Sequence, residues 1–279
     1  MPILKLTTPA PNTTFTIADD TTMPPVKFRT DGSGSHTWSW TMKWGTFSVS
    51  GTATSPGNEW DASAAIADIG GTLSVTVTAA GQSATIAVLI RGTNPTEALV
   101  TNYLAEKAES AGFDKILKQE SRFRHFNAQG EPIKSFDNGY GMCQLTTPVP
   151  SFKQVWSWKR NIDGGLQLFA QKRNAAIAYL GQSGRSYTPD QLRRETVCRW
   201  NGGSYHVWEG NPAAWVRNGN ILCDTATGNI GWDMTDAENA GKTEAQLRAR
   251  DKGSYSAPPT AAAHWKYSGV CYADHVLGS

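Results

Sequence analysis

The chain has 279 residues, of which 39% are hydrophobic and 18% are charged, and its formal net charge is +2. This composition is typical of one large or two ordinary folded domains and excludes an intrinsically disordered chain. No apolar run approaches the roughly 18 residues of a membrane-spanning helix, and the charge balance is too even to indicate a nucleic-acid partner. We therefore expect neither a membrane span nor nucleic-acid binding.

Residues 1–92 predict an all-β structure. Their segments alternate between apolar and polar residues or run apolar, and turn-forming stretches such as DGSGS, SPGNE and AAGQ separate them. Short strands at regular spacing favour an antiparallel sandwich of immunoglobulin type. The expected strands are 15–19, 26–30, 36–44, 46–54, 71–79 and 83–90.

One expected strand, HTWSWTMKW at 36–44, is rich in tryptophan. Side chains alternate along a strand, so one of its faces carries Trp38, Trp40, Met42 and Trp44. This face either packs into the core of the sandwich or forms a partly exposed aromatic platform on which sugar rings could stack. The sequence leaves both interpretations open.

The pattern changes at RGTNPTEA, residues 91–98, where glycine, asparagine and proline interrupt the last strand. Beyond it, apolar residues recur at helical spacing. Thr96 can cap a first helix, and Thr188 followed by Pro189 can open a later one. The expected helices are 97–111, 113–122, 151–180 with an interruption at Gly164-Gly165, 188–200 and a short one near TEAQLRARD. The sequence thus predicts two domains, an all-β one at 1–92 and a mainly α-helical one at 97–279.

All four cysteines lie in the second part: Cys143, Cys198, Cys223 and Cys271. None forms a C-x-x-C pair and none has a histidine at the spacing of a zinc site, so we expect no metal and no other cofactor. Buried free thiols are the first expectation. A disulfide between Cys223 and Cys271 is the alternative for a protein that works in an oxidising compartment.

The segment FDKILKQESRFRHFN at 113–127 places an acidic residue among apolar ones. Glu120 follows Leu117, Ile116 and Phe113 by three, four and seven residues, so these side chains share one face of a helix. Apolar surroundings raise the pKa of a carboxyl group because they disfavour its charged form. Glu120 is therefore either a structural acid with a buried partner or a general acid at the floor of a cleft.

Five short segments occur in a recognisable order: ES at 120–121, GYGMCQLT at 139–146, NIDGG at 161–165, WNGG at 200–203 and YADHVL at 272–277. This order resembles the lysozyme-like superfamily of soluble lytic transglycosylases, which cleave the glycan strands of bacterial peptidoglycan. The resemblance covers about 97–208 and 266–277, and it extends in part to goose-type lysozymes. It implies a mainly α lysozyme-like domain at 97–279 with an insertion at about 209–265, which either walls the glycan groove or covers the core.

The resemblance also implies roles for individual residues. Glu120 matches the catalytic acid/base, Ser121 matches the neighbour that helps to orient it, and Tyr272 matches a tyrosine that hydrogen-bonds near the acid. Asn161 and Asn201 match asparagines that contact the substrate or hold the cleft floor. The substrate-binding residues implied in this way are Ser121, Met142, Gln144, Asn161, Trp200, Asn201 and Tyr272.

Two positions depart from the family pattern. Cys143 stands between Met142 and Gln144, where the family has Met-Gln directly, so either Met142 or Cys143 takes the methionine position. Trp200 replaces a tyrosine, which keeps a stacking surface and loses a hydroxyl group. Both departures favour the alternative that the chain is a non-catalytic peptidoglycan-binding or structural protein with a lysozyme-like fold.

Hydrolysis needs a second acid, whereas a lytic transglycosylase uses one glutamate because the 6-hydroxyl of the substrate attacks. Asp137 is the candidate second acid, since goose-type lysozymes carry an aspartate just before their glycine-rich stretch. Asp137 with Asn138 and Gly139 is equally a good turn. Asp163 is expected to be a local cap. By either chemistry, the resemblance implies cleavage of the β-1,4 bond between N-acetylmuramic acid and N-acetylglucosamine.

The expected substrate is therefore the glycan strand of peptidoglycan, in the periplasm or cell wall. The start of the chain, MPILKLTTPAPNTTF, lacks the basic and apolar regions of a secretory signal. We expect synthesis in the cytoplasm and release or delivery by another route, as for a phage lysin, a virion enzyme or a secreted antibacterial effector. A delivery machine, a phage particle or an immunity protein would then be a partner, and residues 1–92 would anchor the enzyme to a wall or to that partner.

Overall fold

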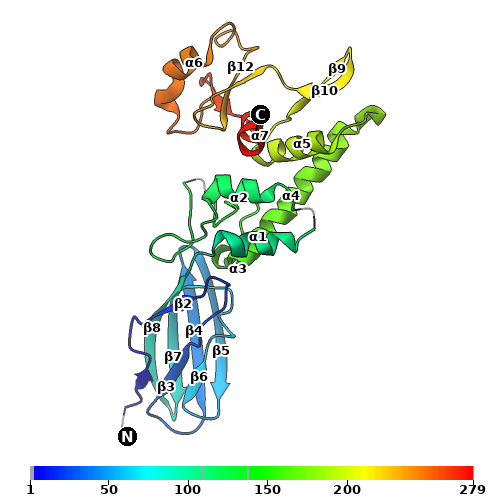
Figure 1. Ribbon diagram of the computed structural model, residues 1–279. Coiled ribbons are helices and arrows are strands. Elements are labelled where there is room, and N and C mark those ends of the chain that lie inside the picture. Colours follow the sequence, from blue (N-terminus) through cyan, green and yellow to red (C-terminus); the bar gives the residue numbers. More distant parts are fainter. Residues whose placement is uncertain (1–2, 109, 137, 279) are drawn as a thin grey trace. The chain divides into compact units, whose positions relative to one another are not determined.

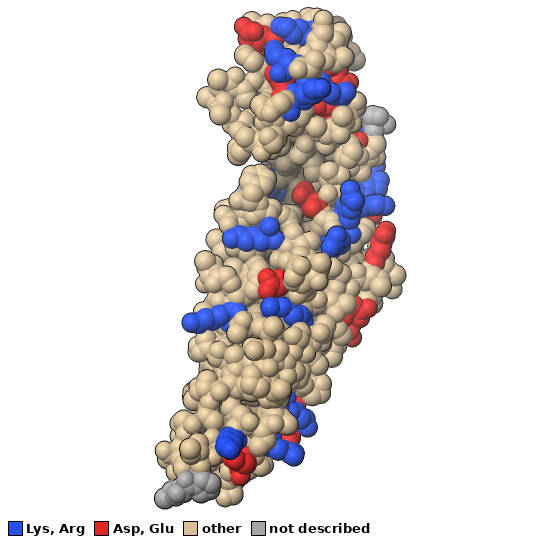
Figure 2. Space-filling view, turned by 90° about the vertical axis from the view of Figure 1, so that its left-hand side faces the viewer, with Lys and Arg blue, Asp and Glu red and all other residues tan. Residues whose placement is uncertain are grey.

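The structure, a computed structural model, describes residues 3–108, 110–136 and 138–278. The chain folds into two compact units, Met1–Ala108 with Glu120–Gly165 and Glu109–Gln119 with Leu166–Ser279. Both sheets and helices are present (Figure 1). Within the described residues, no helix has the length and apolar character that crossing a membrane would require. Figure 2 shows a face on which basic and acidic side chains are interspersed among wide uncharged areas.

Two β-sheets form the N-terminal part of the first unit (Figure 1). Their strands are β1 (Leu6–Thr8), β2 (Thr14–Ile17), β3 (Lys27–Thr30), β4 (His36–Trp44), β5 (Phe47–Ser55), β6 (Glu59–Asp61), β7 (Gly71–Ala79) and β8 (Gln82–Gly92). The larger sheet has the order β2–β8–β7–β4–β5, and the smaller sheet has the order β1–β3–β6. The six strands that the sequence predicts are all present. The sequence does not predict β1 and β6, because strands of three residues are too short to show an alternation.

The prediction of a fully antiparallel sandwich is wrong for one pair of strands. β2 runs parallel to β8, with Thr14 opposite Leu89, while the other neighbouring strands are antiparallel. A parallel pair needs a long connection between its strands, and β2 and β8 are separated by all the other long strands of the sandwich. Alternation within a strand shows which face is buried and carries no information on the direction of its neighbour.

The tryptophan-rich face of β4 lies in the core of the sandwich. Trp38, Trp40 and Met42 are 0%, 8% and 0% exposed. Trp38 stacks on Trp60 of the smaller sheet, with ring centroids 5.8 Å apart. The core interpretation is confirmed for these three residues, and the exposed platform is wrong for them. Trp44, the last residue of the strand, is half-buried.

The core of the sandwich continues into residues 120–165. One buried hydrophobic cluster includes the strand residues together with Phe126, Tyr140, Val155 and Trp156. Two glycines allow this contact: a Cβ at Gly92 would lie 2.2 Å from the Phe126 ring, and a Cβ at Gly70 would lie 2.3 Å from the Trp156 ring. The compact unit therefore runs through 91–98, where the sequence predicts a domain boundary. The change of period at 91–98 marks a change of secondary structure within one core.

The helices are α1 (Glu97–Ala105), α2 (Phe113–Ser121), α3 (Phe152–Trp156), α4 (Trp158–Leu180), α5 (Pro189–Asn201), α6 (Glu244–Asp251) and α7 (Gly269–Leu277), with 3-10 turns η1 (Gln182–Gly184) and η2 (Lys252–Ser254). The two predicted caps are confirmed. The side chain of Thr96 accepts from Leu99 N at the start of α1, and that of Thr188 accepts from Gln191 N at the start of α5.

The helical stretch predicted at 151–180 is divided elsewhere than expected. The break lies at Ser157, between α3 and α4, whereas the Gly164-Gly165 pair lies inside α4. A Cβ at Gly164 would lie 2.6 Å from Gln154 Nε2 and 3.0 Å from Leu145 Cδ1. Gly164 therefore serves close packing and does not interrupt the helix.

The second unit contains two further sheets and a small core of its own. Its strands are β9 (His206–Gly210), β10 (Ala213–Arg217), β11 (Ile221–Cys223), β12 (Ile230–Asp233) and β13 (Lys266–Tyr267). β9 pairs with β10, and β12 lies between β11 and β13. Most of this structure falls in the expected insertion at 209–265, which encloses a buried cluster of Ile230, Trp232, Leu247 and Trp265. Residues 209–265 thus form a folded subdomain around a core of their own.

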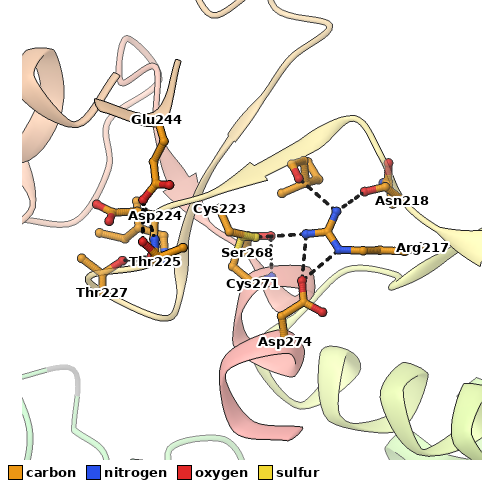
Figure 3. The surroundings of a disulfide bond; sticks show 12 residues. Arg217, Asn218, Cys223, Asp224, Thr225, Thr227, Glu244, Ser268, Cys271 and Asp274 are labelled. Carbon is orange, nitrogen blue, oxygen red and sulfur yellow. Dashed lines mark hydrogen bonds and ion pairs between the residues drawn. A yellow bond between two sulfur atoms is a disulfide. The ribbon is translucent and has the colours of Figure 1, made fainter. Parts of the chain in front are cut away.

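A disulfide ties this subdomain to the last helix. Cys223, at the end of β11, is bonded to Cys271 of α7 (Figure 3). Beside it, Arg217 Nε donates to Asp274 Oδ2 at 2.9 Å (Figure 3). α7 is therefore held by a covalent bond and by an ion pair one helical turn further along.

The four cysteines divide into two kinds. Cys143 and Cys198 are free and buried, which confirms the first expectation for them. That expectation is wrong for Cys223 and Cys271, where the alternative disulfide is present.

Candidate active site

Helix α2 carries the acidic residue that the sequence singles out. Phe113, Ile116 and Leu117 are 0% exposed, whereas the lysines and the glutamine on the other side of the helix are exposed. Glu120 lies in the last turn of α2 and is half-buried. The predicted apolar face is confirmed, and helix geometry places Glu120 at its end.

The chain leaves α2 through a strained turn. Arg122 and Phe123 have φ angles of 54° and 60°, in the left-handed region that favours glycine. Arg124 N donates to Ser121 O at 3.0 Å and closes the turn. Residues other than glycine persist in this region only where surrounding structure holds them, and such strain collects at functional sites. The turn fixes the direction in which the chain leaves Glu120.

Residues 139–145, GYGMCQL, form a tight loop in the same unit. Tyr140 and Leu145 exchange two backbone hydrogen bonds, of 3.0 and 3.1 Å, across the mouth of the loop. Inside it, Gln144 has a φ of 50°, which is again left-handed, and its Nε2 donates to Gly141 O at 2.7 Å. Strained backbone therefore occurs both directly after Glu120 and in this loop.

A buried histidine holds the loop from one side. His125 Nε2 lies 2.8 Å from Val155 O, and its Nδ1 lies 3.2 Å from Met142 N. A carbonyl can only accept and an amide N–H can only donate, so the ring is neutral with its proton on Nε2. Burial lowers the pKa of His125 to about 4, because the charged imidazolium would lose its water. A Cβ at Gly141 would lie 2.5 Å from the ring, which is why the loop needs glycine there.

Asn161 of α4 holds the loop from the other side. Its Oδ1 accepts from Cys143 N at 2.8 Å, and its Nδ2 donates to Tyr140 O at 3.0 Å and to Gln154 O at 3.1 Å. The side chain is fully buried, and both of its N–H groups are used. These bonds hold the GYGMCQL loop against α4 and the end of α3.

Cys143 connects this loop electrostatically with Glu120. Burial raises the pKa of the Cys143 thiol well above its ordinary value, and the charges of Glu120 and Asp163 raise it further. A thiol in such surroundings stays protonated and is a poor nucleophile. Glu120 and the loop therefore share one electrostatic neighbourhood.

Asp163 does not cap a helix, so that expectation is wrong. It lies in the first half of the continuous helix α4. Its Oδ1 accepts from the Tyr103 hydroxyl at 2.9 Å and pairs with Lys107 Nζ at 2.9 Å. Asp163 thus links α4 to Tyr103 of α1 and to Lys107, which directly follows that helix.

In the second unit, the WNGG segment ends α5. Trp200 packs edge-on against Phe113, with ring centroids 5.5 Å apart. Asn201 is the last residue of α5, and its buried Nδ2 has no hydrogen-bond partner among the described residues. A buried amide without a partner is uncommon in folded proteins.

Tyr272 lies in α7, which approaches the end of α5 very closely. A Cβ at Gly269 would lie 2.0 Å from Gly202 O and 2.3 Å from Cys198 O, so only glycine allows this approach. The Tyr272 side chain is buried in the helix that the disulfide anchors. The start of α7, three residues before Tyr272, is thereby placed beside the WNGG segment within this unit.

A fully buried acid, Glu195 of α5, is not among the residues that we singled out from the sequence. Its Oε2 accepts from the backbone N–H groups of Tyr205 and His206, each at 3.0 Å, and its Oε1 lies 2.9 Å from Arg199 Nη2. These bonds hold the chain directly after WNGG. Glu195 precedes the buried Cys198 by three residues, the same spacing that links Leu117 to Glu120.

The predicted site residues divide between the two units. The first unit holds Glu120, Ser121, Met142, Gln144 and Asn161, and the second holds Trp200, Asn201 and Tyr272. Asp137 lies outside the described residues. The sequence analysis did not identify His125. Its role in holding the loop depends on hydrogen bonds to Val155 O and Met142 N, which only the fold brings close to it.

No protein-family model matches the chain, and a search of curated proteins finds no match. Within the described residues, no group of three or more His, Cys, Asp or Glu side chains is placed to hold a metal ion.

Proposed function

We propose that this protein cleaves the β-1,4 bond between N-acetylmuramic acid and N-acetylglucosamine in peptidoglycan, with Glu120 as general acid and base. One observation carries the proposal. Glu120 is half-buried at the end of an apolar helix face, is followed by a strained turn and shares an electrostatic neighbourhood with the GYGMCQL loop. The order of the five segments adds support, because it resembles that of the soluble lytic transglycosylases.

In the proposed reaction Glu120 first donates a proton and then accepts one. As the glycosidic C–O bond breaks, the carboxyl group protonates the departing oxygen, which requires an acid that still holds its proton near neutral pH. The buried Ile116 and Leu117, one turn earlier on α2, provide apolar surroundings of the kind that raise a carboxyl pKa. The resulting carboxylate then accepts a proton from the attacking hydroxyl group.

The identity of that hydroxyl decides between the two chemistries. In a lytic transglycosylase the 6-hydroxyl of muramic acid attacks and leaves a 1,6-anhydro end, and Glu120 alone suffices. In a muramidase a water molecule attacks, and a second acid positions it or stabilises the sugar cation. We propose Asp137 for that second role if the products carry reducing ends.

We further propose that the two sheets of the first unit form an immunoglobulin-like sandwich and that the helical remainder is lysozyme-like, with the subdomain at 209–265 inserted. The single core enclosed by both sheets supports the first assignment. The sandwich would anchor the enzyme to a wall, a phage particle or a delivery machine. It would also support the catalytic segment, since Phe126 and Trp156 belong to the same core as the strands.

We propose that the enzyme acts in the periplasm or cell wall. The Cys223–Cys271 disulfide supports this location, because such bonds persist mainly in oxidising compartments.

Clearing of purified peptidoglycan tests the proposed activity. We expect the unmodified chain to clear the suspension and Glu120→Gln to reduce the rate by at least about 100-fold, which is the lower range of a general acid's contribution. Glu106→Gln makes the same change at an exposed carboxyl group of the same unit and should leave the rate unchanged. An unmodified chain that binds peptidoglycan without clearing it would instead support the non-catalytic binding protein.

A further inference from the structure

A pocket in the first unit lies on the sandwich side of the GYGMCQL loop, where Tyr140 packs against strand residues. It has a volume of about 440 Å³ and opens where the β4–β5 turn and the ends of β7 and β8 meet Glu131, Lys134 and Tyr140. Ligand pockets in proteins are commonly about 300–1,000 Å³. Glu120 is not among the lining residues, which include Lys43, Trp44, Phe47, Arg91, Lys134 and Tyr140.

Three aromatic rings line the apolar part of this pocket. Trp44 lies 6.3 Å from Phe47 and 6.2 Å from Tyr140 between ring centroids, and Phe47 lies 5.5 Å from Tyr140. Tyr140 is buried and packs against the other two rings, so the half-buried Trp44 and Phe47 offer preformed flat surfaces. Trp44 is the one residue of the tryptophan-rich strand face that the core leaves half-buried.

The polar part of the pocket is rich in unpaired donors. Lys43 and Lys134 are exposed and have no ion-pair partner in the described part of the chain. The acidic group, Glu131, is already paired with Arg91, with Oε1 3.0 Å from Nη2. The same part of the chain provides no hydrogen-bond partner for the indole N–H of Trp44 or the hydroxyl of Tyr140.

We propose that this pocket binds a saccharide that carries a carboxylate group. A sugar ring would lie against Trp44 or Phe47, and its carboxylate would lie between the ammonium groups of Lys43 and Lys134. Donors without internal acceptors favour an anionic, acceptor-rich ligand over a neutral one. Lys134 is already directed over the ring of Tyr140, 5.4 Å from its centroid, which places its charge at the aromatic wall of the pocket. The inference does not rest on the proposed activity, because it uses none of the catalytic residues.

Titration calorimetry on the full chain tests this proposal, with four soluble probes. Two carry the carboxylate, N-acetylmuramic acid and glucuronic acid, and two lack it, N-acetylglucosamine and the methyl ester of N-acetylmuramic acid. We expect the acidic probes to bind at least about tenfold more tightly than the neutral ones, which corresponds to about 1.4 kcal/mol. Tighter binding of only one acidic probe would assign the site to muramyl or to uronic saccharides. Equal affinity for acidic and neutral probes would overturn the proposal.

Substitutions test whether the probes bind in this pocket. The double variant Lys43→Met with Lys134→Met should lose the preference for acidic probes, whereas Lys5→Met with Lys153→Met removes two exposed lysines elsewhere in the unit and should keep it. Thr46→Glu adds a negative charge to the pocket lining and should also abolish binding, while Thr52→Glu on the exposed side of β5 should not. Unchanged affinity in both pocket variants, or loss of affinity in Glu120→Gln, would contradict the assignment.

Discussion

His125 and Met142 are joined by a hydrogen bond of 3.2 Å from Met142 N to His125 Nδ1, and this bond exists only while the imidazole is neutral. It connects the chain after Glu120 with the GYGMCQL loop. Because Val155 O occupies the other ring nitrogen at 2.8 Å, a second proton would put an N–H against the amide donor of Met142. The loop beside Glu120 therefore depends on the protonation state of a residue that takes no part in the proposed chemistry.

This relationship predicts that the fold weakens in acid. The pKa of His125 is lowered from 6.5 to about 4 in the folded chain, so the unfolded chain binds the proton more readily. The contribution of neutral His125 to the free energy of unfolding is fully present above about pH 6.5. As the pH falls toward 4, this contribution, about 3 kcal/mol, is lost. Urea unfolding at pH 7 and pH 4 measures the difference in the free energy of unfolding. His125→Gln, which keeps a donor and an acceptor without titrating, should flatten the pH dependence, while His264→Gln should not. An equally steep dependence in His125→Gln would refute this origin.

Asn161→Leu should loosen the loop that Asn161 holds. The substitution leaves Cys143 N and Gln154 O without the bond that Asn161 provides, whereas Tyr140 O keeps its bond from Leu145 N. Since each unsatisfied group costs about 1–3 kcal/mol, we expect a loss of at least about 2 kcal/mol in the free energy of unfolding. Hydrogen exchange at the Cys143 amide should accelerate. Asn174→Leu, at an exposed position of the same helix, is the control, and equal exchange rates in the two variants would contradict the role of Asn161.

Gly269→Ala should separate α7 from the end of α5. Its Cβ would lie 2.0 Å from Gly202 O, a backbone atom that cannot move aside. We expect a loss of about 1–3 kcal/mol, as for other overpacked sites, with a lower melting temperature. Gly253→Ala meets nothing within 4 Å and should melt as the unmodified chain does. Equal melting temperatures for the two variants would show that α7 does not approach α5 in this way.

Alkylation of the unfolded, unreduced chain should label two thiols, Cys143 and Cys198, and reduction should expose two more. The bond joins residues 48 apart in sequence, so loop-closure entropy gives a stabilisation of about 4 kcal/mol. Unfolding in urea with and without reductant measures that difference. Four labelled thiols before reduction, or identical midpoints with and without reductant, would contradict the disulfide.

Features that depend on neighbours along the chain could be predicted from the sequence. The apolar face of α2, the inward face of β4 and the caps at Thr96 and Thr188 all follow from local spacing. The same spacing rule, applied to α5, would have marked Glu195 as a second acid on a buried face.

Features that depend on long-range partners could not be predicted. The parallel pairing of β2 with β8 and the extension of the sandwich core to Phe126 and Trp156 join segments far apart in sequence. His125 becomes structural only when the fold supplies Val155 O and Met142 N. The glycine at position 164 predicts a break in the helix, but the helix continues through it. Gly164 is needed for close packing, because Gln154 and Leu145 lie against it.

The central claim is that Glu120 transfers the proton that breaks a muramyl bond. Mass spectrometry of the material released from purified peptidoglycan tests it most directly, with the unmodified chain and Glu120→Gln compared at equal fold content by circular dichroism. We predict that the unmodified chain releases disaccharide products ending in muramic acid, lighter by one water if the end is anhydro, and that Glu120→Gln releases none. Release of the same products by a folded Glu120→Gln chain, or release by the unmodified chain of peptides with intact glycan strands, would contradict the claim.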